Sequence, residues 1–224
     1  MNLRNVLVLC VLTLVPSIGV TGVQADPGVT EDFSVSANGW LSRNFTPLTF
    51  NAAGGPDGGS YVSYVSSFDP FEDGATAFRG HADFGASGGA FVDDWIDNHW
   101  ITLTAWVRHD GPVPVSFFAR IATPNNTPGA AVISFAPVAP NTWTQLVFDV
   151  RPSSPQLILE GPIAYSSVFD DVGNIQIGLT APAGYEDDTT PFTFALDKVA
   201  VATPEPASCG LLLLGVGGFL LRRR

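Results

Sequence analysis

The sequence predicts an all-β protein, a sandwich of two antiparallel sheets, and three observations lead to this fold class. The 224-residue chain contains 23 glycines and 18 prolines, which is high for a helical protein. Val, Thr, Phe and Trp recur between the Gly/Pro clusters, and these residue types favour strands. Several segments alternate apolar and polar side chains with a period of two, whereas no segment has a convincing helical period. Short strands separated by turn residues are typical of two packed antiparallel sheets.

Three segments show this alternation most clearly. In the segment 100–109, the expected core side chains are Ile101, Leu103, Ala105 and Val107, and the opposite face carries Trp100, Thr102, Thr104, Trp106 and Arg108. In the segment 115–121, the inward residues are Val115, Phe117, Ala119 and Ile121, and the outward ones are Ser116, Phe118 and Arg120. In the segment 141–150, the inward residues are Leu146, Phe148 and Val150. Each segment is therefore predicted to be a half-buried strand.

Further strands are expected in "YVSYVSS", "ISFAPV", "NIQIGLT" and "FTFALDKVAV". The strand ending near Arg108 and the strand beginning near Val115 are close in the sequence, so the simplest prediction pairs them as a hairpin. Trp40 and Trp143 are expected in or beside the core. Neither an internal repeat nor a low-complexity linker interrupts the region 26–203, which is interpreted as one domain.

The charge of this domain restricts its partners. Hydrophobic residues make up 46% of the chain and charged ones only 14%, enough apolar material for one sizeable core. Between residues 26 and 203, 20 acidic residues face six basic ones, a net charge of about −14. Such a surface repels phosphate backbones and anionic lipid, so nucleic acid is not expected as a partner. Divalent cations and neutral ligands are compatible with it.

Both ends of the chain indicate export. At the N-terminus, Arg4 precedes the apolar run 6–15, and Val23-Gln24-Ala25 supplies the small residues of a signal-peptidase site. Residues 1–25 are therefore predicted to be a cleaved signal peptide. The two cysteines, Cys10 and Cys209, both lie outside the region 26–203. The exported domain therefore has neither a disulfide framework nor a cysteine nucleophile.

The C-terminus ends in "PEPASCGLLLLGVGGFLLRRR". An apolar helix over residues 207–221 would be about 22 Å long, short against a hydrocarbon core of about 30 Å. The arginines 222–224 should remain on the cytoplasmic side, with the domain outside. The tripeptide Pro204-Glu205-Pro206, the short helix and Arg222-Arg223-Arg224 together resemble the PEP-CTERM sorting signal of exosortase-processed bacterial proteins. This resemblance implies that residues 204–224 are a transient membrane anchor, removed during delivery to the cell surface or the exopolysaccharide matrix.

A second resemblance concerns the domain itself. The ordered pieces "EDFSVSANGW", "GGPDGGSYVSY", "LTAWVRHDG", "TWTQLVFDV" and "FTFALDKVAV" are similar to jelly-roll modules of the carbohydrate-binding and galactose-binding-like kind. The resemblance implies a structural calcium ion held by Asp32, by the loop from Asp57 to Gly59 and by Asp197. Ser34 departs from the pattern, since a glutamate is common at that position. Two carboxylates and loop carbonyls would only partly fill the six to eight oxygen ligands of Ca²⁺. Solvated aspartates at strand ends are the alternative.

Glycan binding is the favoured activity. The side chains of Trp100, Trp106 and Phe118, with Arg108 and Arg120, are predicted to form a platform for sugar rings. Aromatic faces stack on the apolar side of a pyranose, and arginine donates to its hydroxyls. The alternative is that this aromatic row faces the core, because one face of each strand in a sandwich must be buried.

Catalytic motifs are not evident. The three histidines are His81, His99 and His109, and neither a Gly-x-Ser-x-Gly elbow nor a His-Glu-x-x-His helix is present. The acidic loops "VDDWIDNHW" and "YEDDTT" could supply two carboxylates for glycoside hydrolysis, although solvated acidic loops are the simpler interpretation. The sequence therefore favours a non-enzymatic surface or matrix protein that binds glycan. A purely structural or adhesive domain and a glycan hydrolase are the alternatives.

Overall fold

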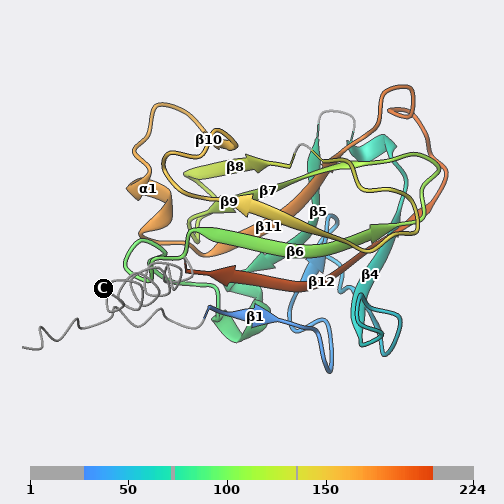
Figure 1. Ribbon diagram of the computed structural model, residues 1–224, viewed down its shortest axis with the longest axis horizontal. Coiled ribbons are helices and arrows are strands. Elements are labelled where there is room, and N and C mark those ends of the chain that lie inside the picture. Colours follow the sequence, from blue (N-terminus) through green and yellow to red (C-terminus); the bar gives the residue numbers. More distant parts are fainter. Residues whose placement is uncertain (1–27, 72–73, 135, 204–224) are drawn as a thin grey trace, which may run out of the picture.

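The computed structural model describes residues 28–71, 74–134 and 136–203, which form two antiparallel sheets packed face to face (Figure 1). Within these residues, sheet A contains β1 (Thr30–Glu31), β3 (Thr49–Asn51), β4 (Tyr61–Ser66), β6 (Thr102–His109), β9 (Thr144–Asp149) and β12 (Phe192–Ala202). Sheet B contains β2 (Leu41–Ser42), β5 (Ala75–His81), β7 (Ser116–Ala122), β8 (Gly129–Ile133), β10 (Leu157–Leu159) and β11 (Asn174–Thr180). The predicted all-β sandwich is confirmed.

The order of the strands sets which side chains share a face. In sheet A the order is β3-β4-β12-β6-β9, with β1 also paired to β12. In sheet B the order is β10-β8-β7-β11-β5-β2. Helical structure in the described residues is limited to α1 (Ser166–Phe169) and to short 3₁₀ turns at Asp69–Phe71, Ala82–Phe84 and Ala86–Gly89. The strands therefore carry both the core and the two outer faces.

The predicted hairpin between β6 and β7 is wrong. The strand β6 pairs with β12 and β9 in sheet A, whereas β7 pairs with β11 and β8 in sheet B. The connection between them contains Gly111, Pro112 and Pro114. Because proline donates no ladder hydrogen bond, this segment does not extend the β6 ladder into a tight turn. The chain instead crosses from one sheet to the other and bonds at Val115 to Val138.

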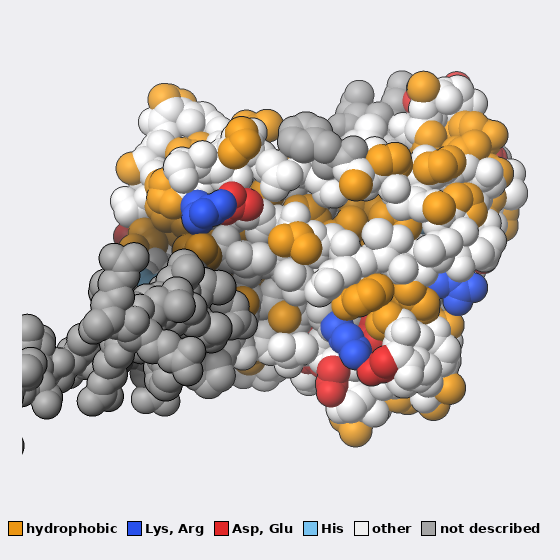
Figure 2. Space-filling model, in the orientation of Figure 1, with side chains coloured by type: hydrophobic (Ala, Val, Ile, Leu, Met, Phe, Trp, Pro, Cys, Tyr) orange, Lys and Arg blue, Asp and Glu red, His pale blue; other side chains and the backbone are white. Residues whose placement is uncertain are grey.

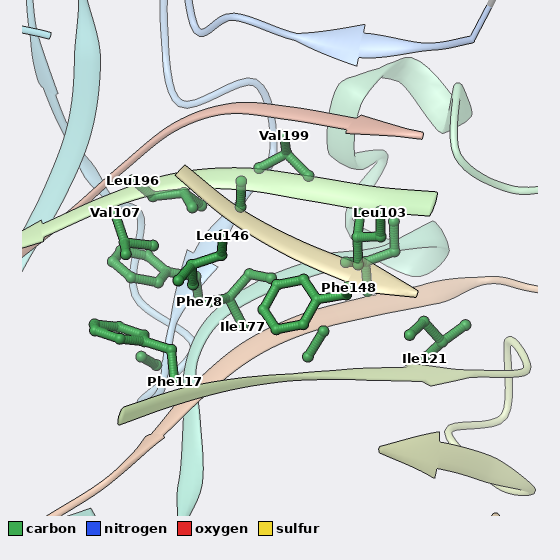
Figure 3. Close-up of a cluster of buried hydrophobic side chains, with 14 of the residues drawn as sticks. Phe78, Leu103, Val107, Phe117, Ile121, Leu146, Phe148, Ile177, Leu196 and Val199 are labelled. Carbon is green, nitrogen blue, oxygen red and sulfur yellow. The ribbon is translucent and has the colours of Figure 1, made fainter. Parts of the chain in front are cut away.

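The core lies between the sheets and contains the predicted inward residues of β6, β7 and β9, except Ile101, which lies just before β6 and is only half-buried (Figure 3). Leu103, Val107, Leu146, Phe148 and Leu196 come from sheet A, and Phe117, Ile121, Phe78 and Ile177 come from sheet B; all are fully or almost fully buried. The alternation predicted for β6, β7 and β9 is thereby confirmed, as is the burial of Trp40. One contiguous core built from both sheets is the hallmark of a domain that folds as a unit.

Two irregularities interrupt the ladders and bear on the outer faces. The pairing of β12 with β6 shifts between Asp197 and Ala200, where Lys198 has a φ of 46°. The pairing of β11 with β5 shifts between Ile177 and Gly178. A bulge changes which face a side chain occupies, so the strict alternation of the sequence cannot be extended through either point.

Candidate functional site

The five residues of the predicted sugar platform do not share one surface. Trp106 and Arg108 lie on the outer face of sheet A, opposite the buried side chains of β6. Phe118 and Arg120 lie on the outer face of sheet B, opposite the buried side chains of β7. The two pairs are therefore on opposite sides of the sandwich. The prediction of a single platform was wrong because it depended on the hairpin between β6 and β7, which does not form.

Trp100 belongs to the core and not to either outer face. Its side chain is only 4% exposed, and its ring packs edge-on against Trp95 at 5.9 Å. The residue before it, His99, has a φ of 56° and closes a turn in which the Trp100 N–H donates to the Trp95 carbonyl. This turn ends the alternation just before β6 begins, so the pattern of the strand does not apply to Trp100.

The outer face of sheet B presents two cross-strand rows on β5, β11 and β7. One row contains Arg79, Gln176 and Arg120, since Gln176 pairs with Arg79 on one side and with Arg120 on the other. The neighbouring row contains Thr76, Gly178 and Phe118 by the same pairings. Thr76 and Gln176 are joined by a side-chain hydrogen bond. Polar groups and one aromatic ring thus lie side by side on this face.

The ring of Phe118 lies directly on Gly178. A Cβ atom added to Gly178 would come within 2.2 Å of Phe118 Cζ, so only glycine leaves room for the ring. Phe118 is half-buried and borders a hollow of about 260 Å³, lined also by Gly74, Ser116, Ile133 and Thr180. An aromatic ring supported from below in this way, with part of its surface in an open hollow, is suited to stacking on the apolar side of a sugar.

A hydrogen-bond network fixes the loop that covers one end of this face. The Asn126 side-chain oxygen accepts from Arg120 Nη1 at 2.7 Å, from Asn174 Nδ2 at 2.8 Å and from Gln176 Nε2 at 2.7 Å. Asn126 has a φ of 62°, a left-handed conformation that asparagine tolerates better than most residues. Asn174 and Gln176 are buried although they point outward from the sheet. The network therefore makes this part of the face rigid.

Arg120 is fully engaged within the protein. Its Nε and Nη2 atoms bond the two oxygens of Glu160 at 2.5 and 2.7 Å, and its Nη2 also donates to the Asn126 carbonyl at 2.9 Å. Gly129 makes room for this arrangement, since a Cβ there would meet Arg120 Nη2 at 2.6 Å. A bidentate arginine–carboxylate pair of this kind has few donors left for a ligand. Arg120 thus has a structural role: it holds Glu160 and Asn126 against β7.

Arg79 is the residue on this face that the sequence did not single out. Its guanidinium lies over the Phe45 ring at 4.8 Å, and its Nε atom is buried without a hydrogen-bond partner among the described residues. Burial lowers the Arg79 pKa, and the charges of Arg43 and Arg120 lower it further. Phe45 is 59% exposed at the end of a tight turn. Outward polar positions on "AFRGH" and "NIQIGLT" were the available signal for this part of the site.

The outer face of sheet A carries the other half of the predicted platform. In the view of Figure 2, hydrophobic side chains are scattered over the surface and charged side chains are few. Trp106 and Arg108 are half-buried there, and a hollow of about 170 Å³ is lined by Arg108, Tyr61 and Thr193, among others. Trp143 lies beside this face and is neither in the core nor packed against it, which corrects its predicted place in or beside the core. Its ring meets Tyr61 edge-on at 5.4 Å, and its Nε1 donates to the Gly54 carbonyl at 2.8 Å. Trp143 therefore holds the loop after β3 against the sheet.

The structure brings the three predicted calcium ligands to one pocket. Asp32, Asp57 and Asp197 line it together with Thr30, Ser60 and Lys198. Asp197 is 1% exposed, and its burial raises its pKa to about 6. A cation already lies there: the Lys198 ammonium is 2.6 Å from Asp57 Oδ2. The described residues contain no cluster of three or more carboxylate or histidine side chains close enough to hold a metal ion. As arranged, these side chains fit an ammonium group rather than calcium.

The acidic loops considered for catalysis bond largely within themselves. Asp94 accepts from the N–H groups of Ile96 and Asp97 at 2.8 and 2.9 Å, which closes its own turn. Asp188 accepts from the Thr190 N–H at 2.8 Å, and hydrogen bonds to Thr190 lower the Asp188 pKa. His109 is buried, and its Nε2 lies 2.9 Å from the Val138 carbonyl oxygen. These groups are accounted for by local structure.

The predicted signal peptide 1–25 and sorting signal 204–224, including the transmembrane helix 207–221, lie outside the described residues. In the part of the chain that the structure describes, no helix has the length and apolar character needed to cross a membrane.

Comparison with known proteins gives one match of sequence and several of structure. A family model described as the PEP-CTERM protein-sorting motif matches residues 202–224, as predicted, and this motif implies export, exosortase processing and sorting to the cell surface. No curated protein matches the sequence. Among solved structures, the CBM22-1 and GH10 modules of Clostridium thermocellum endo-1,4-β-D-xylanase 10B, complexed with xylohexaose, align with a TM-score of 0.47 and 13% identity over 80% of this chain and 28% of that chain.

Two shorter proteins align along nearly their whole length. The L4b domain of human laminin α-2 has a TM-score of 0.46 and 10% identity, over 80% of this chain and 98% of that one. The family 11 carbohydrate-binding module of Clostridium thermocellum Lic26A-Cel5E has a TM-score of 0.44 and 14% identity, over 82% and 99%. The neighbours thus include carbohydrate-binding modules of the predicted jelly-roll kind. Because these TM-scores are below 0.5, the proposed function rests on the side chains of this chain. It carries the PEP-CTERM sorting motif at its C-terminus.

Proposed function

We propose that this protein is a non-enzymatic glycan-binding protein of the bacterial cell surface or exopolysaccharide matrix. The binding site is the outer face of β5, β7 and β11. One observation carries the proposal: the Phe118 ring rests on Gly178 beside an open hollow, next to the row that contains Arg79. Sugar recognition needs an aromatic surface for stacking and donors for hydroxyl groups, and this face has both.

The rigidity of the face supports the same function. The Asn126 side chain ties the loop to β7 and β11, and Arg120 is clamped by Glu160. A site whose side chains are already ordered loses less conformational entropy when a ligand binds. A glycan would therefore meet a surface that needs little rearrangement.

The sorting motif supports a location at the cell surface. In the proposed route, a signal peptidase removes residues 1–25 and exosortase removes the tail after the helix 207–221 has held the protein transiently in the membrane. The domain is then released among the surface polysaccharides of the cell. A domain that binds glycan would be retained there, so the proposed activity and the proposed location agree.

The proposal is tested by native affinity electrophoresis of the full chain in detergent micelles, and in parallel of residues 26–203. The gels contain a panel of polysaccharides, including the exopolymer of the producing organism. At least one polymer should retard the protein, and no reducing ends should be released from it. Uniform mobility in all gels would favour a purely structural or adhesive domain. Release of reducing ends that is lost in Asp94→Asn or Asp188→Asn would establish a hydrolase.

A further inference from the structure

Within the described residues, two arginines on and beside the proposed binding face, Arg43 and Arg79, have no acidic partner. The described domain holds six cationic side chains, and three of them pair with carboxylates: Arg120 with Glu160, Arg151 with Asp149 and Lys198 with Asp57. Within the described residues, Arg43 and Arg79 have neither an ion pair nor a hydrogen bond from the guanidinium; each lies over an aromatic ring instead. In a domain with a net charge of about −14, two cations near each other without a carboxylate call for an explanation.

Arg43 and Arg79 lie on or directly beside neighbouring strands: Leu41 of β2 pairs with Arg79 of β5, and Arg43 follows Leu41 by two residues. The Arg43 charge lowers the pKa of Arg79, after burial as the larger cause, and the Arg120 charge acts in the same direction. Arg43 lies over Phe71 at 5.4 Å, and Arg79 lies over Phe45 at 4.8 Å. Because the rings hold the two guanidinium groups in place without neutralising them, the charges remain available to an anion.

We propose that the glycan bound on this face is a carboxylate-bearing polysaccharide, with a uronic acid carboxylate held by Arg79 and Arg43. This inference rests on the proposed function and names its ligand class. The planar guanidinium matches a carboxylate in a bidentate geometry. The Phe118 ring, in the next cross-strand row, stacks on a neighbouring sugar.

The negative charge of the domain does not contradict this assignment. Charges on exposed groups are largely screened beyond about 8 Å at physiological ionic strength. The two arginines act on the ligand at contact distance, where screening is weak. The net charge therefore slows the approach of an acidic polymer more than it weakens the contact.

The test compares polygalacturonate with its fully methyl-esterified form, which has the same backbone and no charge. The full chain in detergent micelles should be retarded at least about tenfold more strongly by the acid than by the ester. Arg79→Gln and Arg43→Gln should each remove most of this difference. Arg108→Gln is the matched control. It removes the same positive charge, but from the outer face of sheet A, and should leave the retardation unchanged.

Other outcomes separate the two proposals. Equal retardation by acid and ester, or retardation by neutral polymers alone, would overturn the carboxylate site and leave glycan binding standing. The carboxylate site would also be overturned if Arg108→Gln reduced the retardation as much as Arg79→Gln, since that would indicate a general charge effect. Absence of retardation by any polymer would overturn both.

A second inference comes from the aspartate pocket of sheet A. The left-handed Lys198 lies at the bulge in β12, and this bulge places consecutive residues, Asp197 and Lys198, on the same pocket. The Lys198 ammonium contacts Asp57 Oδ2, while Asp57 Oδ1 accepts from the Gly59 N–H at 3.0 Å. Asp197 accepts from the backbone N–H of Lys198 at 2.8 Å. We infer that Lys198 supplies the positive charge that a metal ion supplies in calcium-stabilised sandwiches.

Thermal unfolding with 2 mM CaCl₂ or with EDTA tests this role. The midpoint of the full wild-type chain should be the same in both. Lys198→Met should lower the midpoint in EDTA, because Asp32, Asp57 and Asp197 are then left without a cation. Ca²⁺ should restore it, because these carboxylates, which are too far apart to hold a metal ion while Lys198 lies beside them, can then close around the ion. Arg151→Met, which removes a cation from an exposed pair, is the control and should gain no calcium response. A wild-type midpoint that rises with Ca²⁺, or a Lys198→Met midpoint that Ca²⁺ does not change, would overturn the inference.

Discussion

Phe118 rests on Gly178, and a single methyl group at Gly178 would occupy the space of the ring. Gly178→Ala should therefore displace Phe118 and cost about 1–3 kcal/mol of folding free energy through overpacking. Glycan retardation should fall as well, because the ring would leave its position beside the hollow. Chemical denaturation measures the first effect and affinity electrophoresis the second. Ser116→Ala, at the rim of the same hollow, should change stability by less than about 0.5 kcal/mol. A Gly178→Ala protein with wild-type stability would show that the ring is not held as described.

The side-chain oxygen of Asn126 accepts three hydrogen bonds, from Arg120, Asn174 and Gln176. Asn126→Ala should lower the free energy of unfolding by about 2–4 kcal/mol, because buried amide donors of Asn174 and Gln176 lose their acceptor and alanine tolerates the left-handed φ poorly. Asn126→Asp keeps an acceptor in place and should lose clearly less. Equal losses in the two variants, measured by urea unfolding, would mean that the acceptor is not what fixes the loop.

Trp100 is part of the core, so its loss should affect stability and not binding. Trp100→Ala should reduce the free energy of unfolding by about 3–5 kcal/mol, as expected for a large buried side chain. The fraction of the protein that remains folded should bind glycan like the wild type. A stable Trp100→Ala protein with reduced glycan binding would contradict this prediction and would show that Trp100 takes part in glycan binding.

His109 makes stability depend on pH. It is 1% exposed, and burial lowers its pKa, with the Val138 hydrogen bond and the Asp110 charge acting in the opposite direction. Below about pH 6.5, the unfolded state takes up a proton that the folded state resists. Stability should therefore fall as the pH decreases from 7.5 to 5.5, by about 1.4 kcal/mol for each unit of pKa difference. In His109→Gln this part of the pH dependence should vanish. Parallel curves for the two proteins, from urea unfolding at each pH, would contradict the assignment.

The sequence was sufficient for the fold class and for the buried side of the best strands. The alternation in β6, β7 and β9 identified Leu103, Phe117 and Phe148 as core residues, because a period of two follows from the geometry of a strand. The sorting motif could also be predicted from the sequence, because its residues are contiguous and lie at the C-terminus.

The composition of each outer face could not be predicted, because it depends on which strands become neighbours. Trp106 and Phe118 are twelve residues apart and point outward as expected, yet they lie on opposite sheets. Arg79, Gln176 and Arg120 come from three distant strands, and only the pairings of β11 place them in one row. Local turns also mattered: the left-handed His99 and Lys198 each end an alternation that the sequence alone would continue.

The central claim is that the outer face of β5, β7 and β11 binds glycan, and it is tested most directly by comparing Phe118→Ala with Trp106→Ala. Both variants remove an outward aromatic ring, one from each sheet, and both are compared with the wild type by affinity electrophoresis in the most retarding polysaccharide. We predict that Phe118→Ala weakens retardation about tenfold, in line with the loss of one stacking ring, and that Trp106→Ala matches the wild type. Wild-type retardation of Phe118→Ala, together with its loss in Trp106→Ala, would contradict the claim and assign the site to sheet A.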